Sequence, residues 1–139
     1  MKLSVLSVSF FASAIFILFY SSSCKKNEGC GKSGLPGLGG TASIAGYVRH
    51  HNNPIPLARV FLKFGAKEFP GSDTTIYNLS VTADSGDAHY KFEGINSGDY
   101  YLYGIGYDST IPKTVLGGVP AEICDGTQSV EINVPVTED

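Results

Sequence analysis

The stretch Ala83–Tyr107, ADSGDAHYKFEGINSGDYYLYGIGY, decides the fold. Its apolar residues recur at every second position in two runs, first Tyr90 and Phe92 and then Tyr100 and Leu102. A period of two is typical of a strand with one buried face. Between the two runs, the residues NSGD are of the types that form tight turns. The stretch therefore predicts two strands joined by a turn.

The segments on both sides continue this pattern. Further strands are expected at 41–50, 57–64, 75–82, 114–119 and 128–136, which are separated by turn-forming residues. Gly46, inside the first of these strands, predicts a bulge or a close approach of another segment. Outside the N-terminal apolar run, no window of eleven residues shows the apolar spacing of a helix. Seven short strands of this kind predict an all-β domain over residues 41–139, a seven-stranded antiparallel β-sandwich.

The composition agrees with short strands. The chain has 139 residues, enough for one domain with extra segments, and it contains 17 Gly, 7 Pro, one Met and no Trp. Its net charge is only −3, without a concentration of either sign. Because a nucleic-acid-binding surface is visibly basic, we expect no nucleic-acid partner.

Residues 1–23 are predicted to be a signal peptide. Lys2 precedes an apolar run at 3–20, and three serines at 21–23 lead to Cys24. An uncleaved membrane anchor and a plain secretory signal are the alternatives. The segment resembles the lipobox of bacterial lipoproteins, although Ser21 stands where that motif prefers Leu. The resemblance implies that Cys24 bears palmitate-type acyl chains and anchors the protein in the cell envelope, at the outer membrane of a diderm bacterium.

Residues 24–40 are predicted to be a lipid-anchored flexible tether. The segment from Asn27 to Gly40, NEGCGKSGLPGLGG, is rich in Gly and poor in large apolar side chains. Such a segment buries too little apolar area to offset its ordering entropy.

The order and spacing of several motifs resemble one known family. The motifs are Ile44-x-Gly46-x-Val48, Pro56-Leu57-Ala58-x-Val60, Thr82-Ala83-Asp84, Tyr90-x-Phe92-x-x-Ile95-x-x-Gly98-x-Tyr100-x-Leu102, and Gly106-Tyr107. They are similar to the carboxypeptidase regulatory-like domain, and the match covers 43–107 with a looser tail to residue 136. The resemblance implies a transthyretin-like or immunoglobulin-like Greek-key sandwich. It implies no single activity, because one fold hosts many functions.

Two cysteines are candidates for a disulfide. If Cys24 is lipidated, Cys30 and Cys124 remain as an even pair in an oxidising compartment. A bridge between them would close a loop of about 95 residues and contribute up to about 4–5 kcal/mol by the chain-entropy model. Two free thiols, or pairing with another chain, are the alternatives.

The histidines and acids give weak metal signals. His50 and His51 are adjacent at the end of a strand, where neighbouring side chains point in opposite directions, so we expect them, like His89, to be surface residues. Asp84 and Asp87 are weak candidates for Ca²⁺, although Asp is also an ordinary turn residue. No metal site and no cofactor are therefore predicted.

Aromatic residues form the candidate binding patch. If Tyr100 and Leu102 face inward, the period of two directs Tyr101 and Tyr103 outward. The same alternation directs Tyr47 and Phe61 outward on their own strands. The patch candidates are Tyr47, Phe61, Tyr101 and Tyr103. Tyrosine offers a flat apolar ring with a polar tip, which suits contact with a protein or a glycan. Cross-strand pairing, or cover by a loop, is the alternative.

No set of residues predicts catalysis. The G-x-S-x-G motif is absent, and no His or acid stands at a recognisable triad position. The predicted function is a non-catalytic lipoprotein module of the cell envelope that binds a protein or glycan partner or is an accessory part of an outer-membrane assembly. The alternative is a purely structural envelope domain with no dedicated ligand. An enzyme or a ligand carrier on a transthyretin-like fold would need a polar pocket that no motif predicts.

Overall fold

The computed structural model describes Cys30 and residues 34–139. The predicted signal peptide, the predicted lipidation site at Cys24 and most of the predicted tether lie outside these residues. Among the described residues, no helix has the length and apolar character needed to cross a bilayer.

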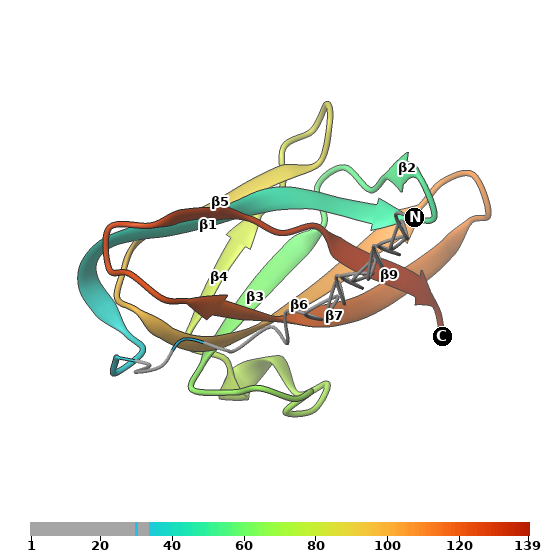
Figure 1. The fold of residues 1–139 in the computed structure, drawn as a ribbon. Coiled ribbons are helices and arrows are strands. Elements are labelled where there is room, and N and C mark those ends of the chain that lie inside the picture. Colours follow the sequence, from blue (N-terminus) through green and yellow to red (C-terminus); the bar gives the residue numbers. More distant parts are fainter. Residues whose placement is uncertain (1–29, 31–33) are drawn as a thin grey trace, which may run out of the picture.

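The described part of the chain is all-β, as the apolar pattern predicted (Figure 1). It contains nine strands and one short 3₁₀ helix, η1 at Thr74–Ile76. The strands are β1 (Leu38–His50), β2 (Asn53–Pro54), β3 (Arg59–Phe64), β4 (Leu79–Thr82), β5 (His89–Ile95), β6 (Gly98–Asp108), β7 (Lys113–Ile123), β8 (Ser129–Glu131) and β9 (Val134–Glu138).

The strands form one continuous sheet that curls around the core, in which β1 pairs with four other strands. The path of hydrogen-bonded neighbours is β2-β1-β9-β7-β6-β3-β4, and β5 and β8 pair with β1 beside this path. β8 and β9 run parallel to β1, whereas the other pairs are antiparallel. The predictions of seven strands and of purely antiparallel pairing are therefore wrong, and the β-sandwich itself stays a prediction.

The predicted C-terminal strand at 128–136 is divided in two for a local reason. Gly46 of β1 lies under the backbone that joins β8 to β9, and a Cβ at this position would collide with the carbonyl oxygen of Ile132. The amide of Ile132 donates to the Ala45 carbonyl oxygen at 2.8 Å. The close approach expected at Gly46 is thus present, and it interrupts the pairing between the end of β8 and the start of β9.

Two other elements differ from the prediction. The predicted strand at 75–82 is a strand only from Leu79, because the Asp73 carboxylate accepts from the amide and the hydroxyl of Thr75, at 2.9 and 2.7 Å, and starts η1. The predicted short strand at 114–119 is the middle of the 11-residue β7, which pairs with β6 along its whole length.

The core fills the space inside the curled sheet. Tyr90, Tyr100 and Leu102 are fully buried, as the period of two predicted. The two tyrosine hydroxyls keep hydrogen bonds, from Tyr90 to the Ile132 carbonyl at 2.6 Å and from Tyr100 to the Asn96 carbonyl at 2.8 Å. Buried phenols with satisfied hydroxyls avoid the cost of an unpaired polar group.

The last residues of the predicted tether belong to the folded body. β1 begins at Leu38, before the predicted domain start at residue 41. The Gly37 amide donates to the Tyr100 hydroxyl at 3.1 Å, and the Gly37 carbonyl accepts from the Asn96 amide at 2.9 Å. Backbone pairing thus orders this Gly-rich segment despite its composition.

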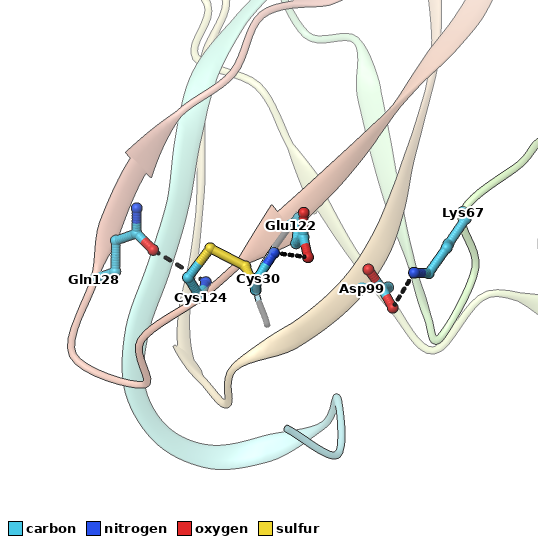
Figure 2. Close-up of a disulfide and its surroundings, with 6 residues drawn as sticks. All are labelled: Cys30, Lys67, Asp99, Glu122, Cys124 and Gln128. Atoms are coloured by element: carbon cyan, nitrogen blue, oxygen red, sulfur yellow. Dashed lines mark hydrogen bonds and ion pairs between the residues drawn. A yellow bond between two sulfur atoms is a disulfide. The ribbon is translucent and has the colours of Figure 1, made fainter. Parts of the chain in front are cut away.

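A disulfide joins Cys30 to Cys124, as predicted (Figure 2). The two Cα atoms lie 5.0 Å apart across a sequence separation of 94 residues. The Cys30 amide donates to the Glu122 carboxylate at 2.8 Å, and the Cys124 amide donates to the Gln128 side-chain oxygen at 3.1 Å (Figure 2). The bridge therefore attaches the N-terminal segment just beyond the end of β7.

Candidate functional site

Three of the four predicted aromatic residues come together on the outer face of the sheet. Phe61 of β3 is the register partner of Tyr103 on β6, and their ring centroids are 6.4 Å apart. Tyr101 lies two residues earlier on the same strand and points to the same face. The period of two therefore predicted their common face correctly.

These residues are not exposed, which corrects the expected open patch. Tyr101 and Tyr103 have exposed fractions of only 8% and 1%. The segment 65–78 between β3 and β4 covers them and contributes Phe69 and Tyr77. Tyr77 stacks on Tyr103 with centroids 5.7 Å apart, and Phe69 lies 5.3 Å from Tyr103. A loop therefore covers these residues, which is one of the alternatives that the sequence left open.

We call Phe61, Phe69, Tyr77, Tyr101 and Tyr103 the aromatic cluster. Its covering segment is held to the sheet by polar contacts. Lys67 forms an ion pair with Asp99 at 3.2 Å (Figure 2), and the Lys63 ammonium donates to the Ile76 carbonyl at 2.7 Å. These contacts fix the position of the loop, and so of Phe69 and Tyr77.

One side of the aromatic cluster opens into a pocket of about 340 Å³. Its lining residues are Phe69, Tyr101, Tyr103, Leu116, Gly117, Gly118 and Thr137. Phe69 keeps 52% of its surface exposed. A Cβ at Gly118 would lie 2.6 Å from Cε1 of Tyr101, so the glycine leaves room for the ring. The result is an apolar recess with aromatic walls and a glycine floor, which we call the glycine-floor pocket.

A second pocket, of about 290 Å³, lies on the β3–β4 side of the aromatic cluster. Its lining residues are Arg59, Phe61, Thr74, Thr75, Tyr77, Asn78, Leu79 and Ser80. The Arg59 guanidinium lies 5.6 Å from the Phe61 ring centroid and donates to the Ser80 hydroxyl at 3.2 Å. This pocket combines two rings with several polar groups, and we call it the polar pocket.

The tyrosines of the aromatic cluster stay neutral far into the alkaline range. Burial raises the pKa of Tyr77 to about 12, with a further contribution from the neighbouring Tyr103 and Tyr101. Burial also raises the pKa of Tyr101 and of Tyr103. A neutral phenol can both donate and accept a hydrogen bond, so the rings that line the two pockets keep a polar function.

Tyr47 does not belong to the aromatic cluster. It lies on β1, where its ring meets that of His89 edge to face with centroids 5.3 Å apart. The Arg49 guanidinium lies 5.1 Å from the Tyr47 ring centroid. Tyr47 thus takes part in cross-strand pairing on a different wall of the body.

The two weak calcium candidates lie in the turn before β5. Asp84 accepts from the Gly86 amide at 2.6 Å, and Asp87 accepts from the His89 amide at 3.0 Å. All four residues line a shallow depression of about 470 Å³. The observed contacts of both carboxylates are those of turn residues.

His50 is buried rather than on the surface, which corrects the expectation for this residue. It has an exposed fraction of 3%, and its ring lies between two carboxylates. Nδ1 lies 2.7 Å from Asp108 and Nε2 lies 2.8 Å from Glu138. The hydrogen bond to Asp108 raises the pKa of His50, and bonds from Thr110 and His50 lower the pKa of Asp108 to about 2.

The sequence reasoning missed Phe69 and Tyr77. Neither lies on a strand of the structure, so a period of two cannot indicate their direction. The available signal was compositional, because Phe69 is a large aromatic residue in a mainly polar segment between two predicted strands, whereas Tyr77 fell within the predicted strand 75–82. Such residues in a loop indicate packing onto a neighbouring surface.

Comparisons with known proteins give the chain no family. No protein-family model and no curated protein matches it. The chain is similar to the crystal structure of a "putative carbohydrate binding protein" from Pseudomonas aeruginosa, with 15% sequence identity and a TM-score of 0.49. The match covers 71% of this chain and 90% of that chain. A similarity at this level supports no conclusion about ligands, and the resemblance to the carboxypeptidase regulatory-like domain stays a prediction.

Proposed function

We propose that this chain is a non-catalytic, lipid-anchored module of the cell envelope that binds a glycan at the aromatic cluster. The observation that carries the proposal is the pair of pockets on either side of the cluster. Each has a volume of about 300 Å³, near the lower end of the range for small-molecule sites. This size suits one sugar unit better than a large protein surface.

The chemistry of the two pockets supports a sugar ligand. The C–H face of a sugar ring packs on aromatic rings such as that of Phe69, while its hydroxyls need hydrogen-bond partners. Tyr101 and Tyr103 can supply these partners in the glycine-floor pocket, and Arg59 and Asn78 can do so in the polar pocket. A recess with mixed apolar and polar lining fits this requirement.

The disulfide changes the geometry of the proposed anchor. From a lipid on Cys24 to the bridge at Cys30, the chain has only six residues, which span at most about 20 Å. The predicted tether extends over residues 24–40, but Cys30 and Gly37 within it are bonded to the body. The proposed anchor would therefore hold the body close to the bilayer surface.

A glycan array tests the proposed function. The full chain, kept in detergent because of its apolar N-terminal run, is labelled and applied to an array of bacterial envelope glycans. We expect saturable binding that Phe69→Ala weakens by about tenfold, because a lost aromatic contact costs about 0.5–1.5 kcal/mol beyond its buried area.

Tyr107→Ala is the matched control, because Tyr107 is also an aromatic residue with 58% of its surface exposed but lies outside both pockets. Equal binding by the wild type and both variants would place the ligand elsewhere. Absence of glycan binding, together with a protein crosslinked at position 69 in intact cells, would replace the glycan with a protein partner.

A further inference from the structure

A second cluster of functional side chains lies at the end of β1, away from the aromatic cluster. Here the last residue of β1, His50, meets the end of β6 at Asp108 and the end of β9 at Glu138. The disulfide is attached near the opposite end of the sheet, since β7 runs back from Lys113 to Ile123 (Figure 1). The strand ends thus bring together residues from distant parts of the chain.

His51 joins this cluster because it lies in a turn. β1 and β2 pair at His50 and Asn53, so His51 and Asn52 form a two-residue hairpin connection. The φ angle of His51 is +53°, in the left-handed region. The alternation of a strand ends there, and the rings of His50 and His51 lie with centroids 4.5 Å apart. The expectation that these side chains point in opposite directions is wrong for this reason.

We propose that His50, His51 and Glu138 form a binding site for a divalent transition-metal ion, with Zn²⁺ as the representative ion. One ligand atom from each of the three side chains lies within 4.8 Å of the other two. Two imidazoles and one carboxylate are a ligand set that zinc takes in proteins, with a fourth position open to solvent or substrate. His51 and Glu138 are exposed, so an ion can reach the site from solution.

The distances allow an ion if the ligand atoms move. The His51 ligand atom lies within 4.8 Å of the other two, so it has to approach them by up to about 1.5 Å. A tetrahedral zinc ion with bonds of about 2.0–2.1 Å needs ligand atoms about 3.3 Å apart. His50 Nε2 and Glu138 Oε2 are now 2.8 Å apart, so they need to separate by about half an ångström. The ion would take the place of the proton that these two atoms share.

Asp108 has the position of an orienting carboxylate. It accepts from Nδ1 of His50 at 2.7 Å and is itself fixed by the amide and hydroxyl of Thr110, at 2.8 and 2.6 Å. Metal-binding histidines nearly always donate their second ring N–H to a carboxylate or carbonyl, which fixes the ring and its tautomer. The buried His50–Asp108 pair supplies this feature and directs Nε2 towards the proposed ion.

Competition with a chromophoric chelator for Zn²⁺ tests the site. The oxidised full chain in detergent should take up one equivalent, and Co²⁺ in its place should give the visible absorption of a low-coordinate site. His51→Asn and Glu138→Gln should each weaken Zn²⁺ binding at least tenfold, and Asp108→Asn should weaken it by about 10–100-fold. The first two substitutions are at exposed residues, so folding should be retained, which circular dichroism checks.

His89→Asn is the matched control, because His89 lies in another part of the sheet and is absent from the cluster. It should bind Zn²⁺ as the wild type does. The proposal is overturned if the wild type takes up no Zn²⁺ at micromolar concentration. It is also overturned if folded His51→Asn and Glu138→Gln proteins retain wild-type affinity, which would place the ion on other residues.

Discussion

The aromatic cluster and the histidine cluster, which consists of His50, His51, Asp108 and Glu138, each contain two residues that are close in the sequence. The direction of the side chains follows a different rule in each pair. Tyr101 and Tyr103 lie inside β6, and the pleat of the strand places them on one face. His50 and His51 lie at the end of β1, where the turn brings adjacent side chains together. The spacing of residues therefore predicts which way side chains point within a strand, but it does not predict this for the first residue beyond the strand.

The two regions also differ in what covers them. A loop of the same chain covers the aromatic cluster and leaves pockets beside it. In the histidine cluster, the carboxylates of Asp108 and Glu138 pair with the buried ring of His50. Apolar packing should thus dominate the contribution of the first region to stability, and electrostatic pairing that of the second.

The largest effect on stability is expected from removal of the disulfide, which should destabilise both regions equally. Replacing Cys30 and Cys124 by serine should lower the free energy of unfolding by about 4–5 kcal/mol, because the bridge closes a loop across 94 residues. Urea unfolding, followed by near-ultraviolet dichroism of the tyrosines and by proton signals of His50, should give coincident transitions. Two separate midpoints would mean that the regions unfold independently.

The next effect should be confined to the aromatic cluster. Tyr103→Ala removes a ring that is 1% exposed and should cost about 3–5 kcal/mol, as expected for an aromatic side chain deleted from a core. Phe69→Ala should cost much less because about half of the surface of Phe69 is exposed. Similar urea midpoints for the two variants would contradict the observed difference in burial.

A smaller effect of opposite sign is expected at the turn. His51 has a positive φ, which is costly for a residue with a Cβ, so His51→Gly should raise stability by up to about 1 kcal/mol. The same substitution should abolish the proposed Zn²⁺ site. His51→Ala, which keeps the Cβ, should show no such gain in thermal midpoint; equal gains for Gly and Ala would exclude relief of backbone strain.

The last prediction concerns the ionisation of Tyr77 at alkaline pH, which should leave stability at neutral pH unchanged. Burial raises the pKa of Tyr77 from its ordinary value of 10.0 to about 12. Because the folded pKa is raised, the associated stability is complete below pH 10 and is lost as the pH rises through about 12. The ultraviolet absorbance of phenolate should rise late in an alkaline titration, and Tyr77→Phe should reduce this late rise by the share of one tyrosine, because the pKa of other buried tyrosines is raised as well. An unchanged late rise in Tyr77→Phe would contradict the raised pKa of Tyr77.

The sequence was sufficient for much of the fold. Alternation identified the inward faces of β1, β3 and β6, and Gly46 marked a real backbone approach. It could not indicate that β8 and β9 run parallel to β1, because a period of two describes the faces of a strand and not the direction of its partner.

The candidate sites were less predictable than the strands. Cover of Tyr103 by Tyr77 depends on the path of a loop, which no periodicity describes. The meeting of His50, Asp108 and Glu138 depends on which strand ends are neighbours, and so on the complete sheet order. The disulfide was predictable because an even pair of cysteines has few alternatives.

The most direct test of the central claim is to map the ligand on the protein. Amide spectra of the ¹⁵N-labelled full chain in detergent are recorded during titration with the best glycan from the array. Ligand binding at the aromatic cluster predicts the largest shifts at Phe69, Tyr101 and the amides of Gly117 and Gly118, which line the glycine-floor pocket. Shifts confined to the wall of β1 and β5, around Tyr47, would contradict it.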